Sequence, residues 1–248
     1  MNPWNRQSAA VAQSQSTTAV DAGLRSYMLK VYNYMASGVL LTGLIAFFVG
    51  QSDAFLSAVL ATNEAGQVTG MSPLGWIVAL APIGMVFFIG MRAQHMSVGA
   101  LQATFWAYAG LMGLSLFSLF LIYTGASILK VFFITAGTFG LLSMYGYATK
   151  KDLTSWGTFL IVGMWAVFLT SIVNVFFMKS SGLDLALSYV GVLLALGLTA
   201  WNTQQVKNIY YTTSGEGLQK ASILGALTLY FDFIYLFVNL LRIMGDRR

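Results

Sequence analysis

The chain has 248 residues, of which 57% are apolar and 8% are charged, whereas a soluble domain is typically about 25% charged. So few charges cannot cover the surface of a water-soluble globule, and the absence of cysteine excludes disulfides and thiolate metal sites. The net charge of +5 comes from basic residues scattered between apolar runs, a pattern that favours bilayer topology over nucleic-acid binding.

Residues 1–25 form a polar segment of low complexity with repeated Gln, Ser and Thr. This composition predicts a disordered tail. No apolar stretch of the kind found in a signal peptide occurs within it, so we do not expect one here.

Seven apolar runs follow, at residues 30–50, 73–91, 98–123, 127–148, 155–178, 185–207 and 221–244. Each is long enough to cross a hydrocarbon core of ~30 Å, and a lipid-exposed segment must satisfy its own backbone, so each is expected to be a helix. The sequence thus predicts an all-α, seven-helix transmembrane domain over residues 26–248. Small residues spaced four apart, Ala136 with Gly140 and Gly191 with Ala195, suggest faces where helices pack closely.

Lys and Arg in the connections predict the orientation. The tail, residues 150–151 and the 207–220 segment carry most of them, whereas residues 51–72 carry none, so the N-terminus is expected to be cytoplasmic. Seven full crossings place Arg242, Arg247 and Arg248 outside, whereas a re-entrant last hairpin would place them inside. We favour seven crossings. With no obvious organelle signal, a bacterial inner membrane is the expected location.

Asp232 is the acid that lies several residues from both ends of its apolar run. A carboxyl group at bilayer depth is costly and is by default a functional candidate. It either hydrogen-bonds to a neighbouring helix as structural support, or it exchanges protons and binds a cation. Three polar residues are candidate partners, namely Asn202, Asn239 and Arg92.

Enzymatic activity is not expected. The single histidine, His95, lies in a short turn, no G-x-S-x-G motif is present, and one mid-helix acid cannot form an aspartic-protease pair. The sequence predicts no cofactor.

At the last run the sequence resembles the Bax inhibitor-1 family, also called the transmembrane Bax inhibitor motif family. Residues 226–242 (Ala-Leu-Thr-Leu-Tyr-Phe-Asp-Phe-Ile-Tyr-Leu-Phe-Val-Asn-Leu-Leu-Arg) are similar to the family signature. Met91-Arg92, residues 150–153 (Lys-Lys-Asp-Leu) and residues 197–200 (Gly-Leu-Thr-Ala) agree with it as well.

The resemblance implies a bundle with the last helix at its centre and a pH-sensitive calcium leak, and in some bacterial members control of a membrane protease. It also implies two paired aspartates on helices six and seven, onto which an arginine from helix two latches. By motif, Asp232 is the helix-seven acid and Arg92 is the latch.

The helix-six acid is replaced in this chain, because the family's Tyr-Asp-Thr-Gln context reads Trp-Asn-Thr-Gln at residues 201–204. The pH sensor and ion path are therefore expected to consist of Asp232 and Asn202. One carboxylate gives at most a weak calcium site and a titration of one proton. The alternative is a non-conducting interaction protein that binds a membrane protease through residues 1–25.

Overall fold

A computed structural model describes residues 3–63 and 67–248, with side chains from Val20 onward. The helices over this part are α1 (Pro3–Val49), α2 (Asp53–Val59), α3 (Pro73–Arg92), α4 (Val98–Ser115), α5 (Phe117–Ile122), α6 (Gly125–Ala148), α7 (Thr154–Val173), α8 (Ser181–Thr212) and α9 (Gly215–Met244). A 3₁₀ turn (Ala93–His95) follows α3 and a π-helical turn (Asn174–Met178) follows α7.

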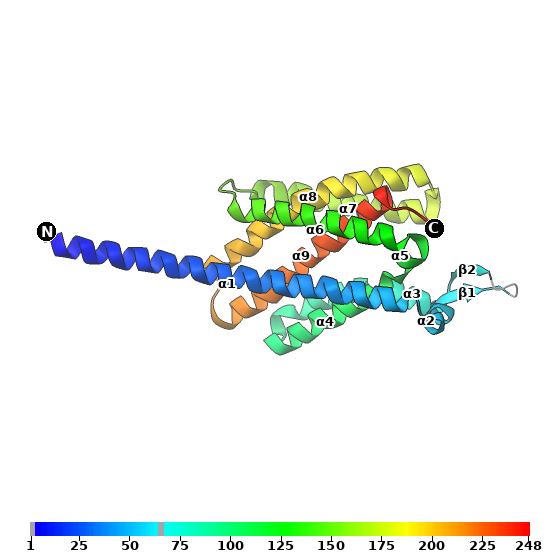
Figure 1. Cartoon of the computed structure of the whole chain (residues 1–248), viewed down its shortest axis with the longest axis horizontal. Coiled ribbons are helices and arrows are strands. Elements are labelled where there is room, and N and C mark those ends of the chain that lie inside the picture. The colour runs from blue at the N-terminus through cyan, green and yellow to red at the C-terminus, as the bar shows by residue number, and fades with distance from the viewer. Residues whose placement is uncertain (1–2, 64–66) are drawn as a thin grey trace.

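Seven helical stretches are long and apolar enough to cross a membrane, which confirms the predicted all-α, polytopic architecture. They are Val20–Val49, Pro73–His95, Val98–Ile122, Gly125–Ala148, Thr154–Met178, Ser181–Thr212 and Gly215–Met244. Helix α9 is unbroken and the C-terminus lies at the opposite end of the bundle from the start of α1 (Figure 1), an arrangement that favours a full crossing of the last run over a re-entrant hairpin.

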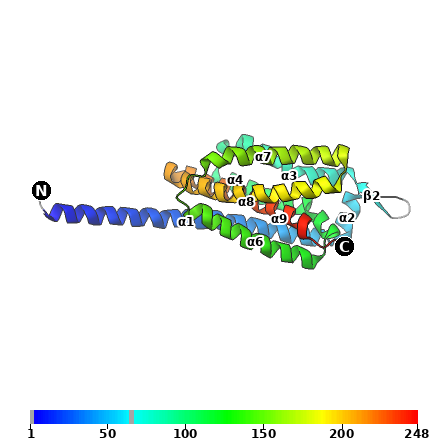
Figure 2. The same cartoon turned by 90° about the horizontal axis from the view of Figure 1, so that it is seen from above.

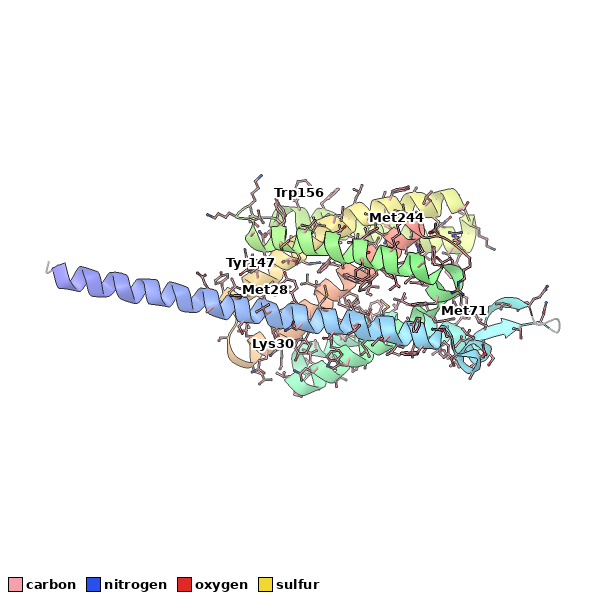
Figure 3. The ribbon with its side chains drawn as sticks, in the orientation of Figure 1. Met28, Lys30, Met71, Tyr147, Trp156 and Met244 are labelled. Carbon is pink, nitrogen blue, oxygen red and sulfur yellow. The ribbon has the colours of Figure 1, made fainter. Side chains whose placement is uncertain are left out.

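The two ends of the bundle are different (Figures 1 and 2). We call one the N-terminal end; it holds the α3–α4, α6–α7 and α8–α9 connections. We call the other the hairpin end; it holds the strands, the α5–α6 connection and the C-terminus. Met71 and Met244 both lie toward the hairpin end (Figure 3).

Helix α1 begins earlier than predicted. It starts at Pro3, at a position where proline is well tolerated, and its first part projects from the bundle (Figures 1 and 2). The structure therefore differs from the predicted disordered tail over most of residues 1–25, and residues 1–2 lie outside the described part. From Leu24 onward the helix is held by packing, because Leu24, Tyr27 and Met28 are buried in the core.

Hydroxyl side chains set the starts of several spans. Ser72, Ser97, Thr124 and Ser180 each accept a hydrogen bond from the backbone N–H three residues on, which caps α3, α4, α6 and α8. The α8–α9 connection is very short, and it turns at Gly215, whose φ of 59° is one that glycine adopts without strain.

A small β-hairpin and helix α2 form the hairpin end, and neither was predicted. Strand β1 (Leu60–Thr62) pairs antiparallel with β2 (Val68–Met71), with Leu60 opposite Met71 and a bulge between Ala61 and Thr62. Such short segments carry too little periodicity to be recognised among longer apolar runs.

Helix α9 has the largest buried share of the seven spans. Two thirds (67%) of its most apolar window is buried, against 17–44% for the others, and it packs on α1, α4, α6 and α8. The large apolar side chains that remain exposed, such as Phe177 at 81% and Phe133 at 69%, form the surface expected for a helix bundle in lipid.

Glycines mark two close helix contacts. A Cβ on Gly146 of α6 would lie 2.2 Å from the carbonyl oxygen of Ala200 on α8, and one on Gly191 would lie 2.8 Å from Asn239 on α9. The predicted packing role of Gly191 is thus confirmed. The packing role predicted for Gly140 is wrong, because nothing lies within 4 Å of a Cβ built at that residue.

Candidate functional site

Asn202 and Asp232 are in contact midway along the last two helices. The amide Nδ2 of Asn202 on α8 donates to both carboxyl oxygens of Asp232 on α9, at 3.0 Å to Oδ1 and 2.8 Å to Oδ2. Asp232 is 4% exposed and Asn202 is half-buried. The pair predicted from the sequence is therefore formed, and it is shielded by the bundle.

The antiparallel packing of α8 and α9 determines which residues meet. The turn at Gly215 folds one helix back on the other, and Gly225 of α9 packs against Val206 of α8. About four turns further along, Gly191 gives room for Asn239. These small residues allow close approach on either side of Asn202 and Asp232.

The carboxyl group of Asp232 has no cationic partner among the described residues, where its hydrogen bonds come from Asn202 alone. A buried carboxylate is costly unless it is paired, and an amide donor compensates for part of that cost. Proton uptake by Asp232 would cancel this charge and turn one of its oxygens into a hydrogen-bond donor.

Arg92 is not brought to this pair. It ends α3 at the N-terminal end of the bundle, its side chain is exposed, and within residues 3–63 and 67–248 it makes neither a hydrogen bond nor an ion pair. The expected contact with Asp232 or Asn202 is absent from this arrangement. The neighbouring Ile89 and Ala93 take the inward-facing positions and are buried, which leaves Arg92 facing outward.

A second polar cluster lies beside the pair and was missed from the sequence. The hydroxyl of Tyr32 on α1 is 2.7 Å from Ser143 Oγ on α6, which in turn is 2.9 Å from Thr203 Oγ1 on α8. Ser143 and Thr203 are fully buried. This chain of hydroxyls fixes α1 and α6 against α8 at the residue that follows Asn202.

The comparison with known proteins identifies the family. Residues 24–248 match the family described as "Inhibitor of apoptosis-promoting Bax1". The chain belongs to the Bax inhibitor-1 family. The family membership that we inferred from the sequence around Asp232 is therefore confirmed.

Several bacterial relatives of this Bax inhibitor-1 family chain match it over nearly its whole length. Uncharacterized protein RP147 of Rickettsia prowazekii is 44% identical over 229 residues, 92% of each chain. Inner membrane protein YbhL of Escherichia coli K12 is 42% identical over 239 residues, 95% of this chain and 98% of its own. A Caulobacter vibrioides protein is 39% identical over 251 residues, covering all of both chains. Together with the seven spans, these matches make the chain an integral, multi-pass membrane protein.

From the Asn202–Asp232 pair, further polar residues follow one side of α9 toward the hairpin end. Asp232, Tyr235, Asn239 and Arg242 are three or four residues apart and so share one side of α9. Arg242 ends this row 3.7 Å from Asp184, at the start of α8. We call these four residues with Asp184 the polar row.

Asn239 does not partner Asp232, contrary to one of the options that the sequence left open. Its Nδ2 donates to the backbone carbonyl of Tyr235 at 2.7 Å. The hydroxyl of Tyr235 itself is buried and has no hydrogen-bond partner among the described residues. An unpaired buried hydroxyl is costly, so this oxygen is a site where a water or an ion would be favoured.

The described residues do not form a conventional metal centre. No group of three or more His, Cys, Asp and Glu side chains comes together among them. Calcium usually takes six to eight oxygen ligands. At Asp232 it would find one carboxylate and the amide oxygen of Asn202, with the rest supplied by water.

Proposed function

We propose that the chain provides a passive leak for cations, calcium foremost, across a bacterial inner membrane, and that the Asn202–Asp232 pair controls it. The observation that carries the proposal is the buried carboxyl group of Asp232, held by both oxygens to a neutral amide on the adjacent helix. Membership of the Bax inhibitor-1 family and the name of the YbhL relative support the setting.

In this mechanism Asp232 acts as the pH sensor. When it is ionised, the amide of Asn202 occupies both of its oxygens and keeps α8 against α9. When it is protonated, one oxygen becomes a donor, so Asn202 must turn its amide oxygen toward it for the pair to persist. A single carboxyl group gives a one-proton response.

The polar row supplies the path toward the hairpin end. From Asp232 an ion would pass the hydroxyl of Tyr235, which has no partner in the described part of the chain, and then Asn239, before the Asp184–Arg242 ion pair. The two charged residues of that pair are each 42% exposed, so this end is open to water. Toward the other end, Arg92 is the latch in this proposal, and latching would bring its side chain, which is exposed, to the pair.

The test measures calcium flux against pH in vesicles that contain the full chain. Asp232→Asn should abolish the pH dependence, and Asn202→Asp should spread it over two steps and strengthen calcium binding, because two coupled carboxyls titrate as a pair. Glu216→Gln, an exposed acid at the start of α9, is the matched control and should follow the native curve. Three superimposed curves for the native chain, Asp232→Asn and Asn202→Asp would refute the role of Asp232.

Arg92→Ala tests the latch in the same vesicles. Flux at neutral pH should rise, because the Asn202–Asp232 pair would then have to hold the closed arrangement alone. Unchanged flux would leave Arg92 as an anchor at the membrane surface. If folded native protein shows no flux at any pH, the leak proposal fails, and the alternative of a partner that restrains a membrane protease takes its place.

A further inference from the structure

A groove runs along α1 and α4 at the N-terminal end of the bundle, away from the Asn202–Asp232 pair. Its volume is about 730 Å³, and it is open to the outside. The lining residues that matter here are Arg25, Lys30, Asn33, Tyr34, Ser37 and Trp106. Five of them follow one another along about three turns of α1, and Trp106 comes from α4.

The groove carries two basic side chains without acidic partners. Arg25 and Lys30 are both exposed, and neither forms an ion pair within the described residues. Asp21 lies one turn before Arg25, yet it is not among the groove residues and does not pair with Arg25. Two like charges facing the same space favour an anion there, and a guanidinium matches phosphate geometry well.

The floor of the groove is aromatic and fixed. Gln102 Nε2 of α4 donates to the hydroxyl of Tyr34 at 2.5 Å, which ties the two helices together at this level. The Tyr34 ring lies 6.3 Å from that of Trp106, and Trp106 is 36% exposed. Trp and Tyr are typical of the headgroup level of a bilayer, where one side of the ring meets lipid.

The order of groups along α1 matches the order of groups in a phospholipid. Lys30 lies toward the N-terminal end of the bundle (Figure 3), with Arg25 further out and the small polar Asn33 and Ser37 further in. At 1.5 Å per residue, Arg25 and Ser37 are about 18 Å apart along the helix. That distance spans a headgroup, a glycerol and the start of an acyl chain.

We propose that this groove binds one anionic phospholipid of the bilayer. Arg25 and Lys30 hold its phosphate, Asn33 and Ser37 face its ester oxygens, and the upper part of an acyl chain lies against Trp106. Basic pockets between transmembrane helices are a known setting for such headgroups. The site is independent of the proposed leak, since it uses none of the same residues.

Quenching by brominated lipids tests this site with the full chain in phosphatidylcholine vesicles. Dibrominated phosphatidylglycerol or dibrominated phosphatidylcholine is added at equal low mole fraction. The emission of Trp106 is obtained by subtracting the Trp106→Phe variant, because the chain has six tryptophans. The anionic quencher should act on Trp106 more strongly than the zwitterionic one, and added salt should reduce the difference.

Charge variants then assign the preference to the groove. The double variant Arg25→Gln/Lys30→Gln should lower the preference for the anionic lipid by roughly an order of magnitude. Lys150→Gln, an exposed lysine at the same end of the bundle outside the groove, should keep it. All these side chains are exposed, and an unchanged melting temperature verifies folding. Equal quenching by the two lipids in the native chain, or an undiminished preference in the double variant, overturns the proposal.

Discussion

Gly146 of α6 is a position where one added methyl group should have a large structural effect. A Cβ there would lie 2.2 Å from the carbonyl oxygen of Ala200 and 3.0 Å from its carbonyl carbon and Cα. All three obstacles are backbone atoms, so no side-chain rotation can relieve the clash. Gly146→Ala must therefore push α6 and α8 apart.

The size of the effect follows from these distances. Contacts below 3.0 Å are essentially never seen, so the helices must separate by about 0.8 Å locally. One turn away, the 2.9 Å hydrogen bond between Ser143 and Thr203 would lengthen by a similar amount and be lost. Overpacking of this kind costs up to about 3 kcal/mol, and the better helix propensity of alanine offsets about 1 kcal/mol, which leaves a net loss of about 2 kcal/mol.

Gly140→Ala on the same helix is the matched control, because nothing lies within 4 Å of its added methyl group. Thermal unfolding of both variants in one detergent, followed by circular dichroism, measures the difference. For a chain of this size, 2 kcal/mol corresponds to a melting temperature lower by roughly 4–8 °C, while Gly140→Ala should match or exceed the native value. Equal melting temperatures for the two variants would show that the α6–α8 contact is not as tight as described.

Two further predictions concern the connections. The chain has no cysteine, so single cysteines can be introduced as labels: Val68→Cys on the hairpin and Ser214→Cys in the α8–α9 turn. The two should react with membrane-impermeant reagents from opposite sides of the membrane, with Ser214→Cys on the cytoplasmic side. Labelling of both from one side would contradict the topology. The second concerns Asp152, where hydrogen bonds from the Thr154 side chain and backbone N–H hold the pKa of the carboxyl group below its usual range. The ionised Asp152 side chain should therefore stabilise the fold slightly above the ordinary aspartate pKa of about 3.9, and this stabilisation should be lost as the pH falls through the lowered pKa. The melting temperatures of the native chain and Asp152→Asn should differ above pH ~4 and converge in more acidic solution. A difference that does not change with pH would contradict this.

The membrane spans could be predicted because hydrophobic length is a local property. All seven runs were found. The errors lie at helix ends and reach ten residues at 20–29, where polar residues continue the helix beyond the apolar run. The hairpin at Leu60–Met71 was missed because its strands are too short for a pattern.

The site was predictable only in part, for a related reason. Asp232 and Asn202 were found because polar residues within apolar runs are conspicuous, and their contact follows from the adjacent antiparallel helices. The Tyr32–Ser143–Thr203 cluster joins three helices that are far apart in sequence, so which faces meet cannot be read from any one of them. The exposed position of Arg92 likewise depends on how α3 packs, not on its own sequence.

The burial of α9 has a consequence for biosynthesis. This helix follows the other six spans in the chain, yet it packs against four of the earlier helices, α1, α4, α6 and α8. Until it has left the ribosome and entered the bilayer, those four helices have no partner for the faces they finally turn toward it. The earlier helices can already pack in pairs, such as α1 with α4 and α6 with α8, but the faces that contact α9 stay uncovered until it arrives. Its arrival then completes the bundle and forms the Asn202–Asp232 contact in the same step.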